Sequence, residues 1–184
     1  MLKTTLPFIG LLAAGCSDGL FYIEVEESAE VTVPGGTLLE ELLGDLGFEE
    51  FVTMDITASD ELVNQGVEPG DIVNVALTAF DLEVTAPADG DMAFLEEMSV
   101  FVNGDGLPRV RLASLDAFPE GQQRVSFERD EVDLTPYVVG TAMGIETEVT
   151  GRSPDEDTTI KAYFVVEVGV TSQGVKNQLR SSDD

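Results

Sequence analysis

The side chains available for chemistry in this sequence are almost all carboxylates. Its 184 residues include 36 Asp and Glu, 9 Lys and Arg, no histidine and one cysteine, Cys16. Without histidine, Ser-His-Asp and Cys-His catalysis and nearly all zinc and copper sites are excluded. The chemistry that remains is carboxylate catalysis, a Ser-Lys pair using Lys161 or Lys176, or the binding of a hard cation.

Three short stretches each place two oxygen ligands close together on a turn, which is what calcium requires. The candidate calcium ligands are Asp89 and Asp91, Asn103 and Asp105, and Asp155 and Asp157. None of the stretches matches the EF-hand loop, because the twelfth position counted from Asn103 is Ser114 rather than Glu. Asp, Asn and Gly are also the residues that tight turns need without a metal. Calcium and turn chemistry therefore both stay open, and no other cofactor is expected.

The carboxylates give no specific sign of an enzyme, since 36 acidic residues produce close pairs by chance. Glycoside cleavage needs two carboxyls at a set separation, one raised pKa and an aromatic platform for the sugar. The sequence has no Trp and only 3 Tyr. We expect no enzymatic activity and keep a carboxylate-based hydrolase as an alternative.

Arg109 and Arg111 lie two residues apart on a predicted strand and so share one face. Such a pair could hold a carboxylate or phosphate ligand. In a chain this acidic, we expect both to pair with neighbouring Asp and Glu side chains.

The net charge of −27 makes the surface repel phosphate backbones and anionic headgroups. Nucleic acid is therefore excluded as a partner. The acids are spread along the chain rather than gathered in one block, which favours a solvated surface.

Alternating apolar residues, separated by turn signals, predict an all-β fold. We expect one β-sandwich domain, for which an Ig-like shape is one form, capped by two or three short helical turns. The predicted strands are a pair within 20–33, then 51–57, 72–85, 98–103, 107–115, 124–128, 145–150 and 158–171. The predicted helical turns are 37–44, 59–65 with Ser59 as cap, 92–97, and one starting at Thr135-Pro136 with the Thr135 hydroxyl as cap.

The apolar pattern also predicts local features of several of these strands. In 72–85 the apolar alternation changes phase at Ala79-Phe80, which predicts a bulge or bend there, as when a strand passes between two packed sheets. In 158–171 every second residue from Ile160 to Val170 is apolar, which predicts one buried face. Strands 98–103 and 107–115 should form a hairpin across Gly104-Asp105-Gly106.

The first sixteen residues have the parts of an export signal: Lys3, an apolar run over 6–14, and small residues before a cut site. Nine apolar residues reach about 14 Å as a helix, too short for the ~30 Å hydrocarbon core of a bilayer. The end of the segment, Leu12-Ala13-Ala14-Gly15-Cys16, resembles the lipobox of bacterial lipoproteins. The resemblance implies cleavage after Gly15 and attachment of diacylglycerol, with palmitate as a typical acyl chain, to Cys16. Ala13 departs from the family, which usually has Leu there.

This resemblance implies a lipoprotein of the cell envelope whose partner is the membrane, reached through the lipid anchor. Ser17 stands where Asp often retains such proteins at the inner membrane, so we expect the outer membrane, facing the periplasm or the surface. A plain secretory signal is the alternative. The predicted domains are a signal peptide (1–15), a tether (16–19), the β-sandwich (20–171) and a disordered polar tail (172–184).

The expected function is non-enzymatic: binding of an envelope protein or small ligand, or a structural role. The alternatives are a calcium-dependent adhesion or binding module and the hydrolase. No resemblance is claimed for the body of the chain.

Overall fold

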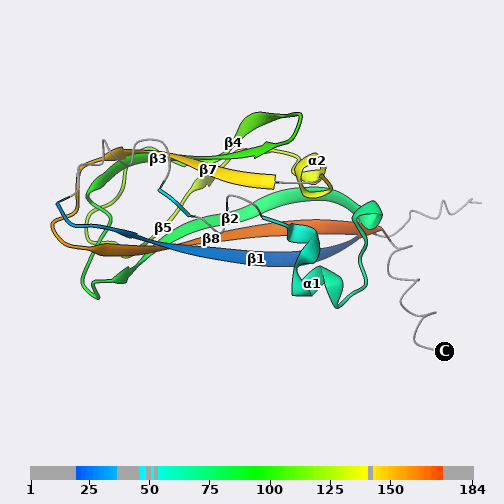
Figure 1. Cartoon of the computed structure of the whole chain (residues 1–184), viewed down its shortest axis with the longest axis horizontal. Coiled ribbons are helices and arrows are strands. Elements are labelled where there is room, and N and C mark those ends of the chain that lie inside the picture. Colours follow the sequence, from blue (N-terminus) through cyan, green and yellow to red (C-terminus); the bar gives the residue numbers. More distant parts are fainter. Residues whose placement is uncertain (1–19, 37–45, 49–50, 52–53, 141–142, 172–184) are drawn as a thin grey trace, which may run out of the picture.

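The computed structural model describes residues 20–36, 46–48, 51, 54–140 and 143–171. Two four-stranded antiparallel sheets lie face to face, which confirms the predicted β-sandwich (Figure 1). The first sheet has the order β1 (Leu20–Val33), β8 (Thr158–Thr171), β2 (Ile72–Ala86) and β5 (Arg124–Ser126). The second has the order β6 (Glu128–Arg129), β4 (Leu107–Leu115), β3 (Leu95–Gly104) and β7 (Met143–Gly151). The short helices are η3 (Ile56–Ala58), α1 (Asp60–Val63), η4 (Pro69–Asp71) and α2 (Thr135–Val138).

Strand β8 forms the centre of the first sheet, between β1 and β2. The predicted buried face is confirmed, because its alternating apolar side chains are all fully buried: Ile160, Ala162, Phe164, Val166, Val168 and Val170. These residues belong to one continuous hydrophobic core, which is formed by the inner faces of the two sheets.

Strand β1 is one strand of 14 residues, so the predicted pair of short strands is wrong. It pairs with β8 along its whole length, from Leu20 opposite Thr171 to Val33 opposite Thr158. The apolar alternation is interrupted at Glu27, which occupies an inward position between Val25 and Ala29. The strand continues through this acidic residue because every position of β1 has a partner on β8.

The predicted irregularity in β2 is confirmed near the predicted place. A register shift between Leu77 and Ala79 leaves Thr78 as the extra residue, and its hydroxyl donates to the Val165 carbonyl at 3.1 Å. The shift turns Phe80 towards the core, where it is 1% exposed.

β2 itself does not pass between the sheets, which corrects the expected reason for the bend. The crossing is made by the predicted strand 124–128, since β5 pairs with β2 and β6 pairs with β4. At the corner, the Phe127 N–H donates to the Phe80 carbonyl at 3.0 Å.

The strand order is that of a jelly roll rather than of an Ig domain. The first and last strands are neighbours in one sheet, and β7 and β3 are neighbours in the other. Among the described residues, the bridge from Met54 to Met143 lies where a jelly roll has a further strand beside β7. With that bridge counted, the chain alternates between the sheets as two Greek keys do.

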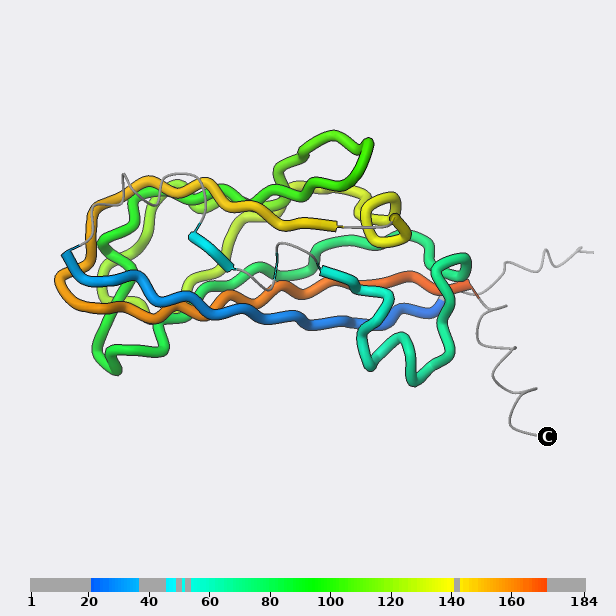
Figure 2. The backbone as a smooth tube through the Cα atoms, in the orientation of Figure 1, coloured from blue at the N-terminus to red at the C-terminus, as the bar shows by residue number. Residues whose placement is uncertain are grey.

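The predicted strand 51–57 is wrong in its described part; residues 52 and 53 lie outside it. Phe51, Met54 and Ile56 are buried, but Met54 makes only a bridge and Ile56 begins η3. The centre of the Phe51 ring lies 6.1 Å from that of Phe164 on β8. The described residues of this segment run between β1 and β7 at one flank (Figure 2).

The helical turns predicted after Ser59 and at Thr135-Pro136 are confirmed as α1 and α2, whereas the turn predicted for 92–97 and the cap predicted for α2 are wrong. Ser59 caps α1 as predicted, its hydroxyl accepting the Leu62 N–H at 3.4 Å. Residues 92–94 form a turn that leads into β3, so the predicted helical turn 92–97 is wrong. The Thr135 hydroxyl does not cap α2; it accepts the Val75 N–H at 2.9 Å and so joins the helix to β2.

The hairpin of β3 and β4 is confirmed, with Gly104 opposite Leu107 and Gly106 at φ 75°. The helix predicted for 37–44, the signal peptide and the polar tail lie outside the described residues.

The pairing of β2 with β8 generates a prediction at Gly169, which lies opposite Val73. A Cβ added there would overlap the Val73 carbonyl oxygen, a backbone atom held in the sheet. Gly169→Ala should lower the free energy of unfolding by about 1–3 kcal/mol, measured by urea denaturation. The control is Gly70→Ala, where nothing lies within 4 Å of the added atom. Equal stability of the two variants would contradict this packing.

Candidate functional site

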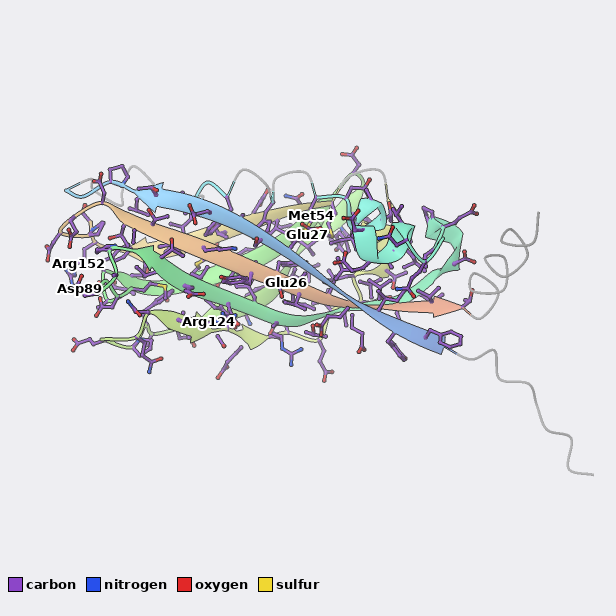
Figure 3. The ribbon with its side chains drawn as sticks, turned by 90° about the horizontal axis from the view of Figure 1, so that it is seen from below. Glu26, Glu27, Met54, Asp89, Arg124 and Arg152 are labelled. Atoms are coloured by element: carbon purple, nitrogen blue, oxygen red, sulfur yellow. The ribbon has the colours of Figure 1, made fainter. Side chains whose placement is uncertain are left out.

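The structure brings three of the six predicted calcium ligands together. Asp89, Asp91 and Asp155 line one pocket of about 220 Å³, with Arg152 and Glu156. The pocket is built by the loop between β2 and β3 and the loop between β7 and β8. It lies at the end of the sandwich away from the start of β1 (Figure 3).

Asp91 binds backbone amides inside this pocket. Its Oδ1 accepts the Ala93 N–H at 3.1 Å and its Oδ2 accepts the Gly121 N–H at 2.7 Å. The hydrogen bond from Gly121, followed by that from Ala93, lowers the pKa of Asp91. Asp91 thus joins its own loop to the loop that precedes β5, which is the turn chemistry left open above.

Asp157 also joins two loops by accepting a backbone hydrogen bond. Its Oδ1 accepts the Gly35 N–H at 2.8 Å, which joins the turn after β1 to the loop before β8. Gly35 has no room for a side chain, since a Cβ would lie 2.7 Å from the Glu156 Cα.

The other two predicted ligands lie apart from this pocket, on the β3–β4 hairpin. The Asn103 amide nitrogen donates to Oε1 of Glu146 on β7. Asp105 is exposed at the turn. Across the described ranges, no three acidic side chains are arranged so that they could hold a metal ion.

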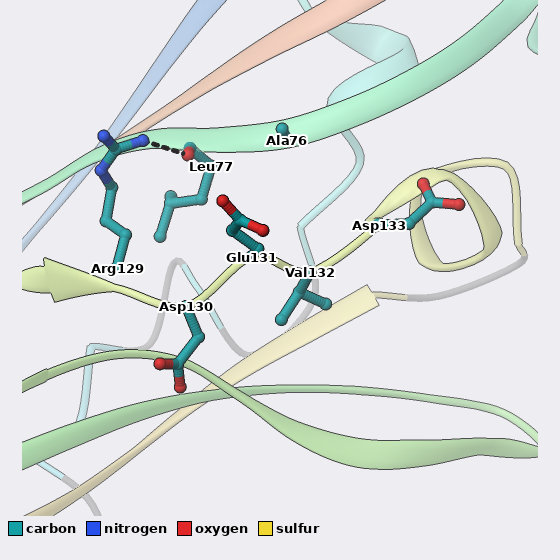
Figure 4. A pocket seen from close by; sticks show the side chains of 7 residues that line it. All are labelled: Ala76, Leu77, Arg129, Asp130, Glu131, Val132 and Asp133. Carbon is teal, nitrogen blue, oxygen red and sulfur yellow. Dashed lines mark hydrogen bonds between the residues drawn. The ribbon is translucent and has the colours of Figure 1, made fainter.

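A second pocket, of about 470 Å³, lies beside β2 at Ala76 and Leu77 (Figure 4). Its other wall is the segment 129–133, where Arg129 Nη1 donates to the Leu77 carbonyl at 2.8 Å. The backbone of β2 is bound on this side by Phe127 and Leu134, so Arg129 bridges a gap in the edge of the strand. The position of Arg129 could not be predicted from the sequence, because nothing in the apolar pattern shows that the strand 124–128 changes sheets.

Arg109 and Arg111 pair with acids, as predicted. Arg109 contacts Glu146 and Glu148, both at 2.8 Å, and lies 3.5 Å from the centre of the Phe101 ring. Arg111 contacts Asp130 at 2.8 Å. These contacts occupy the guanidinium groups that an anion would need.

The carboxyl with a raised pKa, which a carboxylate-based hydrolase needs, lies outside both pockets described above. Within the described chain, Glu27 is the carboxyl whose pKa is raised, first by burial and then by Glu61. Neither glutamate lines either pocket above. Lys161 lies 4.9 Å from the centre of the Tyr163 ring, and Lys176 is outside the described residues.

Comparisons with known proteins identify no family. No model of a protein family and no curated protein matches the sequence. Among solved structures, the chain is similar to one of Desmodium yellow mottle tymovirus, with 10% identity, 93% of each chain covered and a TM-score of 0.28. Nothing is inferred from a likeness this weak. Within the described part of the chain, no helix has the length and apolar character needed to cross a membrane.

The geometry of Asp91 predicts a pH-dependent stability effect. In Asp91→Asn one amide oxygen remains for two N–H groups, so at pH 7 the free energy of unfolding should fall by about 1 kcal/mol. A lowered pKa means that the Asp91 charge stabilises the fold above its unfolded value of about 4, and that this contribution is lost as the pH falls through the lowered pKa. The difference between variant and wild type should therefore shrink in acid, as measured by urea denaturation from pH 7 to pH 2.

The matched control is Asp89→Asn, which removes the same charge from the same pocket. Asp89 accepts no hydrogen bond from any described residue, so this variant should leave stability almost unchanged. Equal losses at both positions, or an Asp91→Asn loss that persists at pH 2, would contradict the proposed role of Asp91.

Proposed function

We propose that this protein is a lipid-anchored protein of the cell envelope, and that its β-sandwich serves in non-enzymatic binding or as a structural element. The single observation that carries the proposal is the position of the only cysteine. Cys16 follows Leu12-Ala13-Ala14-Gly15 directly and stands four residues before β1 begins at Leu20. Acyl chains on Cys16 would hold the protein on a bilayer without any membrane-spanning helix.

The fold supports the proposal because it separates the two ends of the molecule. β1 and β8 are antiparallel, so the first residue of β1 and the last residue of β8 lie at one end. The pocket lined by Asp89, Asp91 and Asp155 lies at the other end of the sandwich (Figure 3). Fourteen extended residues span on the order of 45 Å, so an anchor at Cys16 would present the pocket far from the bilayer.

The outer membrane is the proposed location, based on Ser17 after the cysteine. The acidic surface suits this role, since a net charge of −27 makes the charged faces of the protein repel anionic headgroups and favours their exposure to solvent.

The test compares the full-length chain with Cys16→Ser, both expressed in a bacterium that processes lipoproteins and is fed labelled palmitate. The wild type should incorporate label and sediment with membranes, because each acyl methylene buried in the bilayer stabilises membrane binding by about 0.8 kcal/mol. The variant should do neither. Ala13→Leu, which restores the usual lipobox residue, should be labelled at least as strongly as wild type.

A wild-type chain that is exported and cut but remains unlabelled and soluble would contradict the proposal and favour the plain secretory signal.

A calcium-dependent adhesion or binding module stays the alternative. Asp89, Asp91 and Asp155 line one pocket, but among the described residues no three acids are arranged as a set of metal ligands. For such a module, millimolar calcium should raise the midpoint of thermal unfolding, since a ligand that binds only the folded state stabilises it. The rise should disappear in Asp89→Asn/Asp155→Asn and with a chelator. A midpoint that calcium leaves unchanged would remove this candidate.

A further inference from the structure

We propose that the end of the sandwich where β1 begins rests directly on the bilayer through the rings of Phe21 and Tyr22. The inference depends on the proposed lipid anchor at Cys16 and deepens it, because it assigns the membrane a second contact with the protein.

The observation behind it is an exposed aromatic pair at the start of a strand. Phe21 is 50% exposed and Tyr22 is 54% exposed. The other large apolar side chains that are exposed in the described ranges, Val63 and Val139, are aliphatic. Further along β1, the outward positions carry polar residues: Glu24, Glu26, Ser28 and Glu30. The aromatic surface is thus confined to one end of the strand.

The two rings project from opposite faces of the sheet. They are successive residues of a strand, and successive side chains alternate between faces. A partner packed on either face of the sheet would cover only one of them. A surface that meets the strand end-on, as a bilayer would, contacts both at once.

The covalent chain keeps these rings close to the anchor. Four residues lie between Cys16 and Phe21, so the five Cα–Cα steps from one to the other span at most about 18 Å of extended chain. The acylated cysteine would sit at the membrane surface, where Tyr and other aromatic side chains concentrate at the level of the headgroups. A tether this short gives the rings a high effective concentration at that surface.

Acidic residues near the same end of the sandwich limit which lipids the domain can contact. Phe21 lies opposite Val170, and Ile72 lies on the other side of Val170, directly after η4. Because η4 carries Asp71 and follows Glu68, anionic headgroups would be repelled there. The contact should therefore be made by the rings alone and be strongest on zwitterionic lipid.

The absence of Trp from the sequence makes the contact measurable, since one introduced Trp is an unambiguous probe. The probe variant is Tyr22→Trp, with Phe21→Trp as a second position. The control is Glu30→Trp, an exposed position near the other end of β1. Each full-length chain is produced with labelled palmitate, purified and reconstituted into phosphatidylcholine vesicles whose acyl chains carry bromine, a contact quencher of Trp.

The expected result is that emission from the Tyr22→Trp and Phe21→Trp variants shifts to the blue and is quenched by the brominated lipid, whereas emission from the Glu30→Trp variant is unchanged. Labelled chains in which all three variants keep their emission would overturn the contact while leaving the lipid anchor in place. Quenching of the Glu30→Trp variant as well would also overturn it, because the domain would then lie along the membrane. Chains without label would instead contradict the proposed function.

A protein partner gives a different result. Protection of the Tyr22→Trp probe from an aqueous quencher in native membranes, without quenching in brominated vesicles, would assign the aromatic pair to that partner and overturn the bilayer contact.

Discussion

The whole structure depends on β8 being paired on both edges and buried on its inner face. Every residue of β1 has a partner on β8, and β2 pairs with its other edge across three register shifts. The six inward side chains of β8 are fully buried, and burying an apolar side chain of this kind stabilises a fold by about 1.5–3 kcal/mol. Because both neighbours are antiparallel to β8, this strand also decides which chain ends and loops meet at each end of the sandwich.

That arrangement gives the molecule two distinct ends. The start of β1, the start of β2 and the end of β8 lie together, next to the proposed anchor. The loops before β3 and before β8 meet at the opposite end and form the acidic pocket (Figure 3). A protein held on a membrane by its N-terminus would display this pocket outward, which is the geometry that a surface binding protein needs.

Much of the acidic composition has a structural use. Asp91 and Asp157 accept backbone N–H groups from other loops, and Asp133 accepts the N–H of Thr135 at the start of α2. Other carboxylates pair with Arg109, Arg111 and Arg124 on the outer faces of the sheets. These positions need no bound cation to explain them, whereas Asp89 and Asp155 have no such partner among the described residues.

Period-two alternation was enough to predict β8, the β3–β4 hairpin and the bulge in β2, because in each case the apolar residues all turn towards one core. It failed at Glu27, where an acid occupies an inward position, and at Phe51 and Ile56, whose spacing fits a strand as well as a segment that plugs the flank. The crossing at Phe127 and the pocket beside Arg129 could not be predicted, since both depend on which strands are neighbours. For the same reason, the sequence could not show that Asp89 and Asp155 line the same pocket.

In the proposed lipoprotein, the mature chain begins at Cys16 and carries lipid on that residue. Mass spectrometry of the protein isolated from its own membranes can detect both features. The expected result is an N-terminal peptide that starts at Cys16 and carries a diacylglyceryl group on Sγ. A peptide in which Gly15 is still joined to Cys16 and the thiol is unmodified would contradict it.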